Sequence, residues 1–254
     1  MTLKAVVLAG GRGTRLAPYT TILPKPLMPI GEMPILEVML RQMKRAGVNE
    51  VILTVGHLAA LLRSYFGDGA RWGLSISYSQ ESTPLGTAGP IALVGGLDET
   101  FFVTNGDVLT TLRLEDLLEY HKLKGGIATI AVHQRRVRID LGVVQWNGDN
   151  TVSGYTEKPS YDYTVSMGIY VFEPRVVDYI PDAQYLDFPD LVLKLLAGGE
   201  RVNGYIFDGY WKDLGRADDY EQATRDFAEM QPQFLPADSG GASGPVTVAS
   251  EHGA

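Results

Sequence analysis

The chain has 254 residues, of which 45% are hydrophobic and 20% charged, a composition typical of a globular protein with a sizeable core. Its formal net charge of −8 disfavours non-specific binding to nucleic acid, which depends on neutralising phosphates with lysine and arginine. It has no cysteine, which excludes disulfides, thiolate metal sites and cysteine nucleophiles. No apolar run reaches about 18 residues, and the chain enters a strand directly without a signal peptide, so we expect a cytoplasmic protein with no membrane partner.

Predicted strands and helices alternate along the first half of the chain. Apolar runs at 5–9, 50–56 and 100–107 predict buried strands, and alternation at 74–81 predicts another. Helices are expected at 34–47, from about 57 to 66, and at 114–122, and a further strand at 126–134. This order predicts an α/β fold with a doubly wound, mostly parallel, Rossmann-like mixed sheet.

The regular alternation of predicted strands and helices ends after Gln134. Residues 142–159 predict a hairpin around a turn at 147–150, followed by a strand at 167–174 and a helix at 187–199. Two short segments, RVNGYIF and YWKDLG, precede a final helix at 216–230. We therefore expect one domain over 1–230, and a flexible tail over 231–254, which is rich in Pro, Gly, Ser and Ala.

The first strand leads into a glycine-rich loop, GGRGTR at 10–15. A P-loop requires Lys followed by Ser or Thr, which these glycines lack, and a dinucleotide fingerprint requires a third glycine where Leu16 stands. What remains is a turn whose backbone amides can approach an anion closely. Arg15 and Lys25 add two cations, so the segment predicts a polyphosphate site.

The segment LAGGRGTRLAPYT…LPKPLMPIGEMPI, at 8–35, resembles the signature of the sugar-1-phosphate nucleotidyltransferases, also called nucleoside-diphosphate-sugar pyrophosphorylases. Further matching elements are PLGTAGP at 84–90, NGD at 105–107, EKP at 157–159, GIYVF at 168–172 and WKDLGRADDY at 211–220. The resemblance covers roughly residues 3 to 230, everything except the tail. It implies a nucleotidyltransferase domain with a small β-hairpin sugar-binding subregion, and an enzyme that joins a nucleoside triphosphate to a sugar 1-phosphate and releases pyrophosphate.

The resemblance also implies roles for individual residues. The sugar phosphate would attack the α-phosphorus in line, with Arg15 on the β- and γ-phosphates and Lys25 on the α-phosphate as the catalytic pair. Asp107 and Asp213 would share a Mg²⁺ ion, the expected cofactor. The implied nucleotide-binding residues are Leu8, Ala9, Gly10, Gly11, Gly13, Thr14, Arg15, Glu81, Gly86, Thr87, Asn105 and Asp107.

The sugar phosphate would be bound by Gly142, Glu157, Lys158 and Gly168. A carboxylate accepts hydrogen bonds from hydroxyls and an ammonium group binds phosphate, which suits such a ligand. Leu141 stands where the family often has an aromatic residue, and Ser166 and Met167 where it often has Asn-Thr. Both departures flank the sugar pocket, so mannose, glucose, a heptose and a cyclitol all stay open.

One position in the sequence indicates which base the nucleoside triphosphate carries. Family members that use thymidine or uridine triphosphate often carry Gln five residues before the glycine of the Gly-Thr element, and here that position is Glu81. A carboxylate only accepts, which suits the adjacent N–H donors of guanine, and the motifs most resemble the mannose-1-phosphate guanylyltransferase branch. We therefore expect GTP. If the motif is instead aligned one residue earlier, Gln80 occupies the base-reading position and the thymidylyl- or uridylyltransferase alternative is restored.

An alternative of another class is a non-catalytic regulatory subunit that binds nucleotide-sugar. Such a protein could dispense with Arg15, Lys25, Asp107 or Asp213, and all four are present, which favours the enzyme. The expected partners are therefore the two substrates and no nucleic acid, with a homo-oligomer left open. We expect the four histidines, among them His57, to be structural or solvated.

Overall fold

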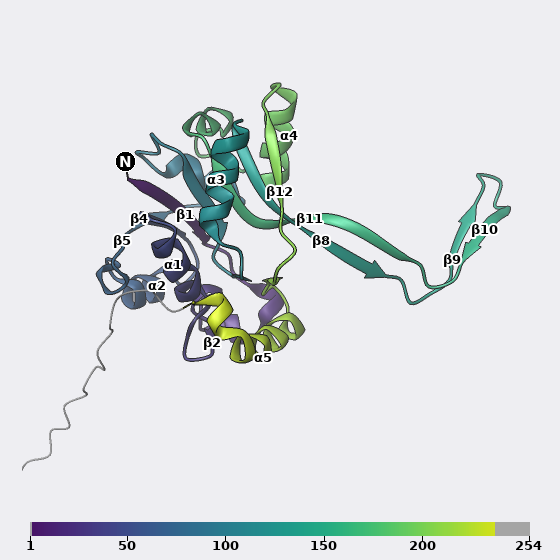
Figure 1. Cartoon of the computed structure of the whole chain (residues 1–254), viewed down its shortest axis with the longest axis horizontal. Coiled ribbons are helices and arrows are strands. Elements are labelled where there is room, and N and C mark those ends of the chain that lie inside the picture. Colours follow the sequence, from purple (N-terminus) through teal and green to yellow (C-terminus); the bar gives the residue numbers. More distant parts are fainter. Residues whose placement is uncertain (1, 237–254) are drawn as a thin grey trace, which may run out of the picture.

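A computed structural model of the chain describes residues 2–236 (Figure 1). Its central sheet has seven strands in the order β12–β8–β11–β6–β1–β4–β5. In that order their bounds are Val202–Ile206, Ala128–Arg138, Ser160–Phe172, Phe101–Asn105, Leu3–Ala9, Val48–Val55 and Ser75–Gln80. β11 is antiparallel to both of its neighbours, and every other pair is parallel. The predicted mixed, mostly parallel sheet is confirmed.

Helices cover both faces of this sheet. α1 (Ile35–Arg45), α2 (Ala59–Phe66) and α3 (Leu114–Lys124) pack on one face, and α4 (Phe188–Ala197) packs on the other. Because successive side chains of a strand point to opposite faces, Val7 and Phe102 join the first core while Val6 and Phe101 join the second. The short 3₁₀ helices span Thr14–Leu16, Tyr19–Thr21, Lys25–Leu27, Ala70–Trp72, Gly89–Leu93 and Pro174–Tyr179.

A third core lies beneath α5 (Ala217–Phe234), beside two small sheets. These sheets pair β2 (Pro29–Ile30) with β3 (Met33–Pro34), and β7 (Val108–Thr110) with β13 (Trp211–Asp213). α5 runs four residues beyond the expected start of the tail, because the ring of Phe234 is buried in this core. The rest of the expected tail, 237–254, lies outside the described residues. Within residues 2–236, no helix combines the length and the apolar character needed to cross a membrane.

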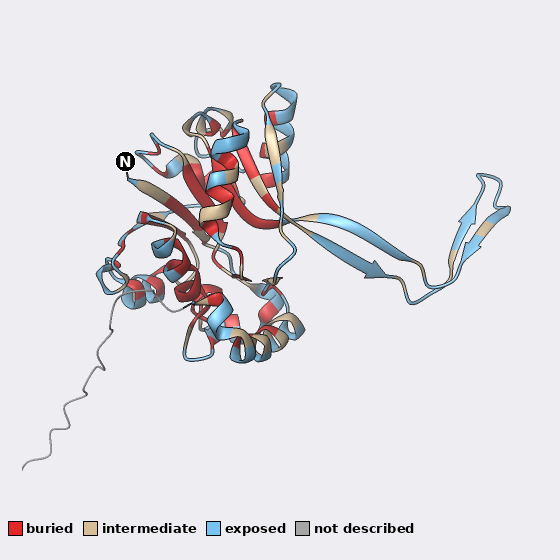
Figure 2. Cartoon of the chain, viewed as in Figure 1, coloured by how far each residue is buried: buried red, intermediate tan, exposed pale blue. Residues whose placement is uncertain are grey.

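A two-stranded ribbon projects from the sheet (Figure 1). The sequence predicts a strand ending near Gln134 and a separate hairpin, whereas β8 continues to Arg138 and pairs with β11 from Ser160 onward. The predicted hairpin forms the far end of this ribbon, with β9 (Val143–Trp146) paired to β10 (Val152–Thr156). We call residues 134–164 the arm, and almost all of it is exposed (Figure 2).

Candidate active site

A cleft of about 760 Å³ opens at the carboxyl ends of β1, β4 and β6, where open α/β sheets bind ligands. Its walls come from the loops after β1, β4, β5 and β6, from the end of β13 and from the segment before α4. The lining residues are Leu8, Ala9, Gly10, Gly11, Arg12, Gly13, Arg15, Lys25, Pro26, Thr54, Gly56, His57, Glu81, Ser82, Thr83, Pro84, Gly86, Thr87, Pro90, Asn105, Gly106, Asp107, Tyr185, Asp187 and Asp213.

This lining takes in all the expected catalytic, metal-binding and nucleotide-binding residues except Thr14. Thr14 begins the first 3₁₀ helix and is exposed. The walls also contain four residues that the sequence did not indicate as site residues: Arg12, His57, Tyr185 and Asp187. Arg12 lies within the glycine motif itself, so its neighbours could have indicated it. His57, which we expect to be structural or solvated, is half-buried in the wall of the cleft.

The glycine loop turns at Gly13, whose φ of 61° lies in the left-handed region that favours glycine. The Thr20 hydroxyl donates to the Gly13 carbonyl oxygen at 2.8 Å and closes the turn. A Cβ on Gly13 would approach the Thr20 methyl carbon to 2.9 Å, so a larger residue would displace this contact. The turn exposes Arg12 and Arg15, which line the cleft.

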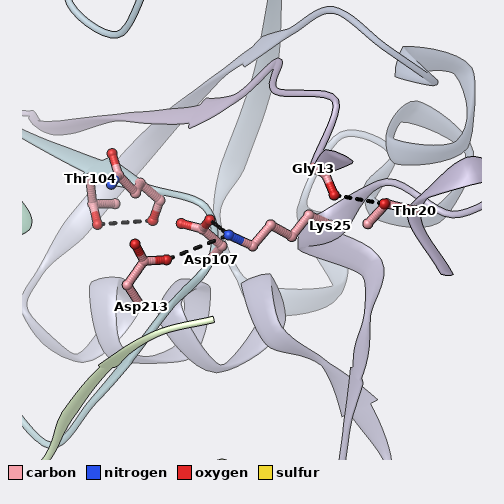
Figure 3. A network of polar contacts seen from close by, with 7 residues as sticks. Gly13, Thr20, Lys25, Thr104, Asp107 and Asp213 are labelled. Atoms are coloured by element: carbon pink, nitrogen blue, oxygen red, sulfur yellow. Dashed lines mark hydrogen bonds and ion pairs between the residues drawn. The ribbon is translucent and has the colours of Figure 1, made fainter. Parts of the chain in front are cut away.

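Lys25 meets two carboxylates in the cleft (Figure 3). Its side chain forms an ion pair with Asp107 and a longer one with Asp213, 3.5 Å from Nζ to Oδ1. Only 9% of Lys25 is exposed. The sequence gives no local reason for this group to assemble, because Lys25 and Asp213 are 188 positions apart.

The small β7–β13 sheet holds the two aspartates together. Asp107 ends the turn after β6, and Asp213 pairs in register with Val108 at the start of β7. The backbone N–H of Leu214 donates to the Asp107 carbonyl oxygen at 3.1 Å, which fastens the two segments next to the carboxylates. The sheet therefore fixes the backbone of both acids while their side chains face Lys25.

Burial raises the pKa of the Asp107 carboxyl above its ordinary value, because a charged group is disfavoured when it is withdrawn from water. The neighbouring Asp213 raises it further, and Lys25 opposes the increase. Two carboxylates that face each other favour the approach of additional positive charge. The residues present would fit a hard cation, with two carboxylate ligands and room for phosphate oxygens. No cluster of three or more metal-ligating side chains occurs among the described residues.

Glu81 lines the cleft directly after β5. Its Oε2 accepts a hydrogen bond from the Leu85 backbone N–H at 3.0 Å, which orients the carboxylate. Gly10 and Gly56 make room for it, since a Cβ on Gly10 would lie 2.8 Å from Glu81 Oε1 and a Cβ on Gly56 would lie 3.2 Å away. Gln80 does not line the cleft, because its side chain lies near Arg63, with Nη2 and Oε1 3.4 Å apart.

A second wall links Thr87 to the segment before α4. Asp187 Oδ1 accepts from the Thr87 backbone N–H at 2.9 Å and from its hydroxyl at 3.0 Å. The Tyr185 hydroxyl donates to Asp187 Oδ2 at 2.6 Å. Gly86, with a φ of 80°, packs against this segment where a Cβ would lie 2.6 Å from the Leu186 carbonyl oxygen. These contacts span about 100 positions of sequence, so no local pattern indicates Asp187.

The four expected sugar-phosphate residues lie outside the cleft lining. Gly168 is buried behind Asn105 with a φ of 72°, and a Cβ there would lie 2.6 Å from Asn105 Nδ2. Gly142, Glu157 and Lys158 all lie on the arm (Figure 1). There, Gly142 packs against Tyr155, whose hydroxyl donates to Glu157 Oε2 at 3.4 Å.

The family model described as nucleotidyl transferase matches residues 4–230. The chain belongs to this family. Its relatives include a UTP–glucose-1-phosphate uridylyltransferase from Synechocystis, 37% identical over 88% of this chain, and a mannose-1-phosphate guanylyltransferase from Mycobacterium tuberculosis, 36% identical over 87%. The matched regions cover 63% and 64% of those two family members, so the chain spans less than two thirds of their length.

Solved structures show the same family fold. The protein HddC from Yersinia pseudotuberculosis matches with a TM-score of 0.68 over 89% of this chain and 100% of that one, at 23% identity. A UDP-glucose pyrophosphorylase complexed with UDP-glucose matches with a TM-score of 0.68 over 90% and 99% of the two chains, at 20% identity. The expected fold and family are confirmed.

Proposed function

We propose that the protein transfers a nucleotidyl group from a nucleoside triphosphate to a sugar 1-phosphate. The observation that carries this is the convergence of Lys25, Asp107 and Asp213 beside the glycine loop, in a cleft large enough for a nucleotide. A regulatory subunit that only binds nucleotide-sugar would have no use for this charged group. The names of the relatives support the same class of reaction.

In this reaction, a phosphate oxygen of the sugar 1-phosphate attacks the α-phosphorus of the triphosphate. The new bond joins that oxygen to the α-phosphorus, the bond from the α-phosphorus to the β-bridging oxygen breaks, and pyrophosphate leaves with the bonding electrons. Negative charge builds up around the α-phosphorus, where Lys25 stabilises it. Arg15, at the edge of the glycine loop, holds the phosphates that depart as pyrophosphate.

Asp107 and Asp213 would hold a divalent cation, and Mg²⁺ suits two carboxylates completed by phosphate oxygens and water. When bound, it would neutralise charge on the triphosphate. Lys25 would then exchange part of its contact with the carboxylates for contact with the phosphate. We therefore infer how the triphosphate lies in the cleft. Its phosphates would lie between the glycine loop and Asp213, and its base would lie toward Glu81.

We propose GTP as the preferred triphosphate, because Glu81 lines the cleft and Gln80 does not. The Glu81 carboxylate has an oxygen free of the Leu85 contact, and it can accept from the two neighbouring N–H groups of guanine. The similarity to a uridylyltransferase keeps UTP as the alternative. Nucleoside triphosphates are cytoplasmic metabolites, so we place the reaction in the cytoplasm.

The test is pyrophosphate release from a matrix of GTP, UTP, dTTP, ATP and CTP with mannose, glucose and heptose 1-phosphates, each with and without Mg²⁺. We expect Mg²⁺-dependent release with GTP and one sugar phosphate. Exclusive use of UTP or dTTP would overturn the assignment of the base while leaving the reaction intact. No release with any pair would overturn the reaction.

A further inference from the structure

The seven-stranded sheet has two edge strands, β5 and β12. An edge strand presents free N–H and C=O groups that can pair with another chain, and proteins commonly protect such an edge with charged side chains or proline. β12 has the sequence VNGYI, which contains neither. Within residues 2–236, no strand pairs with its outer side, so this edge is open.

The free backbone groups of β12 belong to alternate residues. The Phe207 N–H, just after the strand, donates to the Val132 carbonyl oxygen of β8 at 2.9 Å. Because successive residues of a strand direct their N–H and C=O groups to opposite sides, odd-numbered residues here bond to β8 and even-numbered residues face outward. The N–H and C=O groups of Val202, Gly204 and Ile206 therefore point away from the sheet.

Two helices flank this edge, and both expose leucine side chains. β12 runs between α3 and α4 (Figure 1). On the α3 side, the Tyr120 hydroxyl donates to the Gly204 carbonyl oxygen at 3.0 Å, and Leu123, which shares a face of α3 with Tyr120, is 82% exposed. On the α4 side, Leu193 is 63% exposed and Leu196 is 54% exposed. Apolar side chains gathered in this way are typical of an interaction surface.

The opposite edge of the sheet has a different character. The exposed side chains of β5 are those of two serines and Gln80, all of them polar. The Arg63 guanidinium group lies over the Tyr78 ring, 4.6 Å from its centroid, so a positive charge stands beside that edge. On β12 the exposed side chain is that of Ile206, at 58%. The two edges thus differ in polarity, and β12 is the one suited to an apolar partner.

β12 is complementary to a second copy of itself. If two copies run antiparallel with Gly204 at the two-fold axis, Gly204 faces its own counterpart and Val202 faces the other copy's Ile206. Three such opposite pairs result, and each exchanges two N–H···O bonds, which gives about six bonds. A typical protein interface carries about 10 ± 5 direct hydrogen bonds. The Gly204 carbonyl oxygen can keep its bond from Tyr120 as well, because a carbonyl has two lone pairs.

The side chains match in the same register. Val202 packs against the core beneath α4, and Tyr205 packs against the core beneath α3. On the α4 face, each exposed Ile206 would therefore meet the other copy's Val202, an apolar pair. On the α3 face, Asn203 would lie opposite the other copy's Tyr205. No charged side chain of β12 has to be withdrawn from water.

We propose that the chain forms a two-fold symmetric dimer through β12, in which the two central sheets join into one continuous sheet. The exposed leucines of α3 and α4 are then brought alongside the same helices of the other copy. Residues of β12, α3 and α4 do not line the cleft, so both clefts stay open to substrates. The interface is isologous, since the same surface serves both copies, and the inference does not depend on the proposed reaction.

The first experiment places a cross-link at the two-fold axis. The chain has no cysteine, so a single introduced one reports only its own contacts. In an antiparallel hydrogen-bonded pair the Cα atoms are about 5.5 Å apart, within reach of a short bis-maleimide cross-linker. Gly204→Cys should therefore give a cross-linked dimer on a denaturing gel. The substitution fits the single chain, because a Cβ on Gly204 would meet only Val132 Cγ2, at 3.8 Å.

The matched control for the cross-link is Gly95→Cys. Gly95 is also exposed, and a Cβ there meets nothing within 4 Å. Its variant should remain a single chain on the same gel. Absence of the cross-link in Gly204→Cys, or equal cross-linking of the two variants, would overturn the proposal.

The second experiment measures mass by sedimentation equilibrium with the full chain at micromolar concentration. We expect a dimer for the wild type and a single chain for Ile206→Glu, because the carboxylate would be buried against the other copy's Val202. The control is Leu61→Glu, which alters a 39% exposed residue on α2 at the β5 end of the sheet and should leave the dimer intact. A single-chain wild type, or a dimer that withstands Ile206→Glu, would overturn the proposal.

The register is tested by a compensating substitution. Adding Val202→Lys to Ile206→Glu places opposite charges directly across the interface, so the double variant should regain the dimer. In any register that does not bring these two positions together, the added lysine has no carboxylate to meet. A double variant that stays a single chain would therefore overturn the antiparallel pairing about Gly204. Circular dichroism checks that each variant is folded.

Discussion

Lys25 and Asp107, 82 positions apart in the chain, form an ion pair in the cleft, and Asp213 completes the group from a third segment. The lysine is largely buried, so its charge acts in surroundings where water screens it weakly. This pairing keeps the cation in place before any substrate arrives. Preorganised charge of this kind is what a transfer at phosphorus requires.

Replacing Lys25 with alanine should reduce pyrophosphate release by about 10³-fold, because the charge that stabilises the α-phosphate in the transition state is lost. Lys25→Arg should retain part of the activity, since a planar guanidinium group keeps the positive charge but differs in shape from the ammonium group. Steady-state assays with saturating substrates measure the effect, and circular dichroism checks the fold. Wild-type turnover in Lys25→Ala would remove this residue from the mechanism.

Asp213→Asn should abolish Mg²⁺-dependent turnover, since an amide binds a hard cation more weakly than a carboxylate does. A titration of Mg²⁺ against pyrophosphate release, with GTP as the triphosphate, measures the change. Asp208→Asn is the matched control, because Asp208 is exposed in the same segment and does not line the cleft. An unchanged Mg²⁺ response in Asp213→Asn would show that the cation binds elsewhere.

Glu81→Gln should lower kcat/KM for GTP by about 10- to 100-fold, because one acceptor for the guanine edge becomes a donor. Use of UTP should rise relative to GTP, since an amide complements a pyrimidine imide. The glutamine oxygen can still accept from Leu85 N–H, so the loop keeps its shape. Gln80→Ala should change neither value, and a loss of GTP preference there would shift the base-reading role to Gln80.

Gly86→Ala should lower the free energy of unfolding by about 1–3 kcal/mol, because Gly86 has a φ of 80° and its Cβ would lie 2.6 Å from the backbone carbonyl oxygen of Leu186. Gly11→Ala is the matched comparison, since a Cβ there meets nothing within 4 Å, and its stability should change by less than about 0.5 kcal/mol. Urea unfolding of both variants measures the difference. Equal stabilities would contradict the close packing of Gly86 against the Leu186 backbone.

Asp187 should make the stability of the protein depend on pH. Hydrogen bonds from the Tyr185 hydroxyl, and then from Thr87, hold the pKa of the Asp187 carboxyl below its ordinary value. A pKa lower in the folded than in the unfolded protein contributes stability above the unfolded value, about 4, and that contribution is lost as the pH falls through the folded value.

The measurement compares urea unfolding of the wild type and Asp187→Asn across a pH series. The wild type should be more stable at neutral pH, and the difference should shrink steadily below about pH 4. Asp190→Asn serves as the control, because Asp190 is an exposed residue on α4 outside the cleft lining. A difference that stays constant across the series would contradict the shifted pKa of Asp187.

Much of the fold follows from local patterns. The apolar runs that became β1, β4 and β6 and the amphipathic stretch that became α1 are recognisable because burial depends on the period of side chains along a strand or helix. The arm is different. β8 and β11 stay paired along its length, and they leave the sheet where their outer neighbours end, since β12 pairs with β8 only as far as Val132 and β6 pairs with β11 only from Ile169 onward.

The glycine loop, the lysine held between two prolines and the main strands and helices are predictable from local sequence, because each depends on residues close together in the chain. The contacts between distant groups arise from the folded chain: Asp213 meets Lys25 through the β7–β13 pairing, and Asp187 meets Thr87. The fold also places Glu157 and Lys158 on the arm, outside the cleft lining. Such contacts depend on the packing of the whole sheet, which no short segment of sequence specifies.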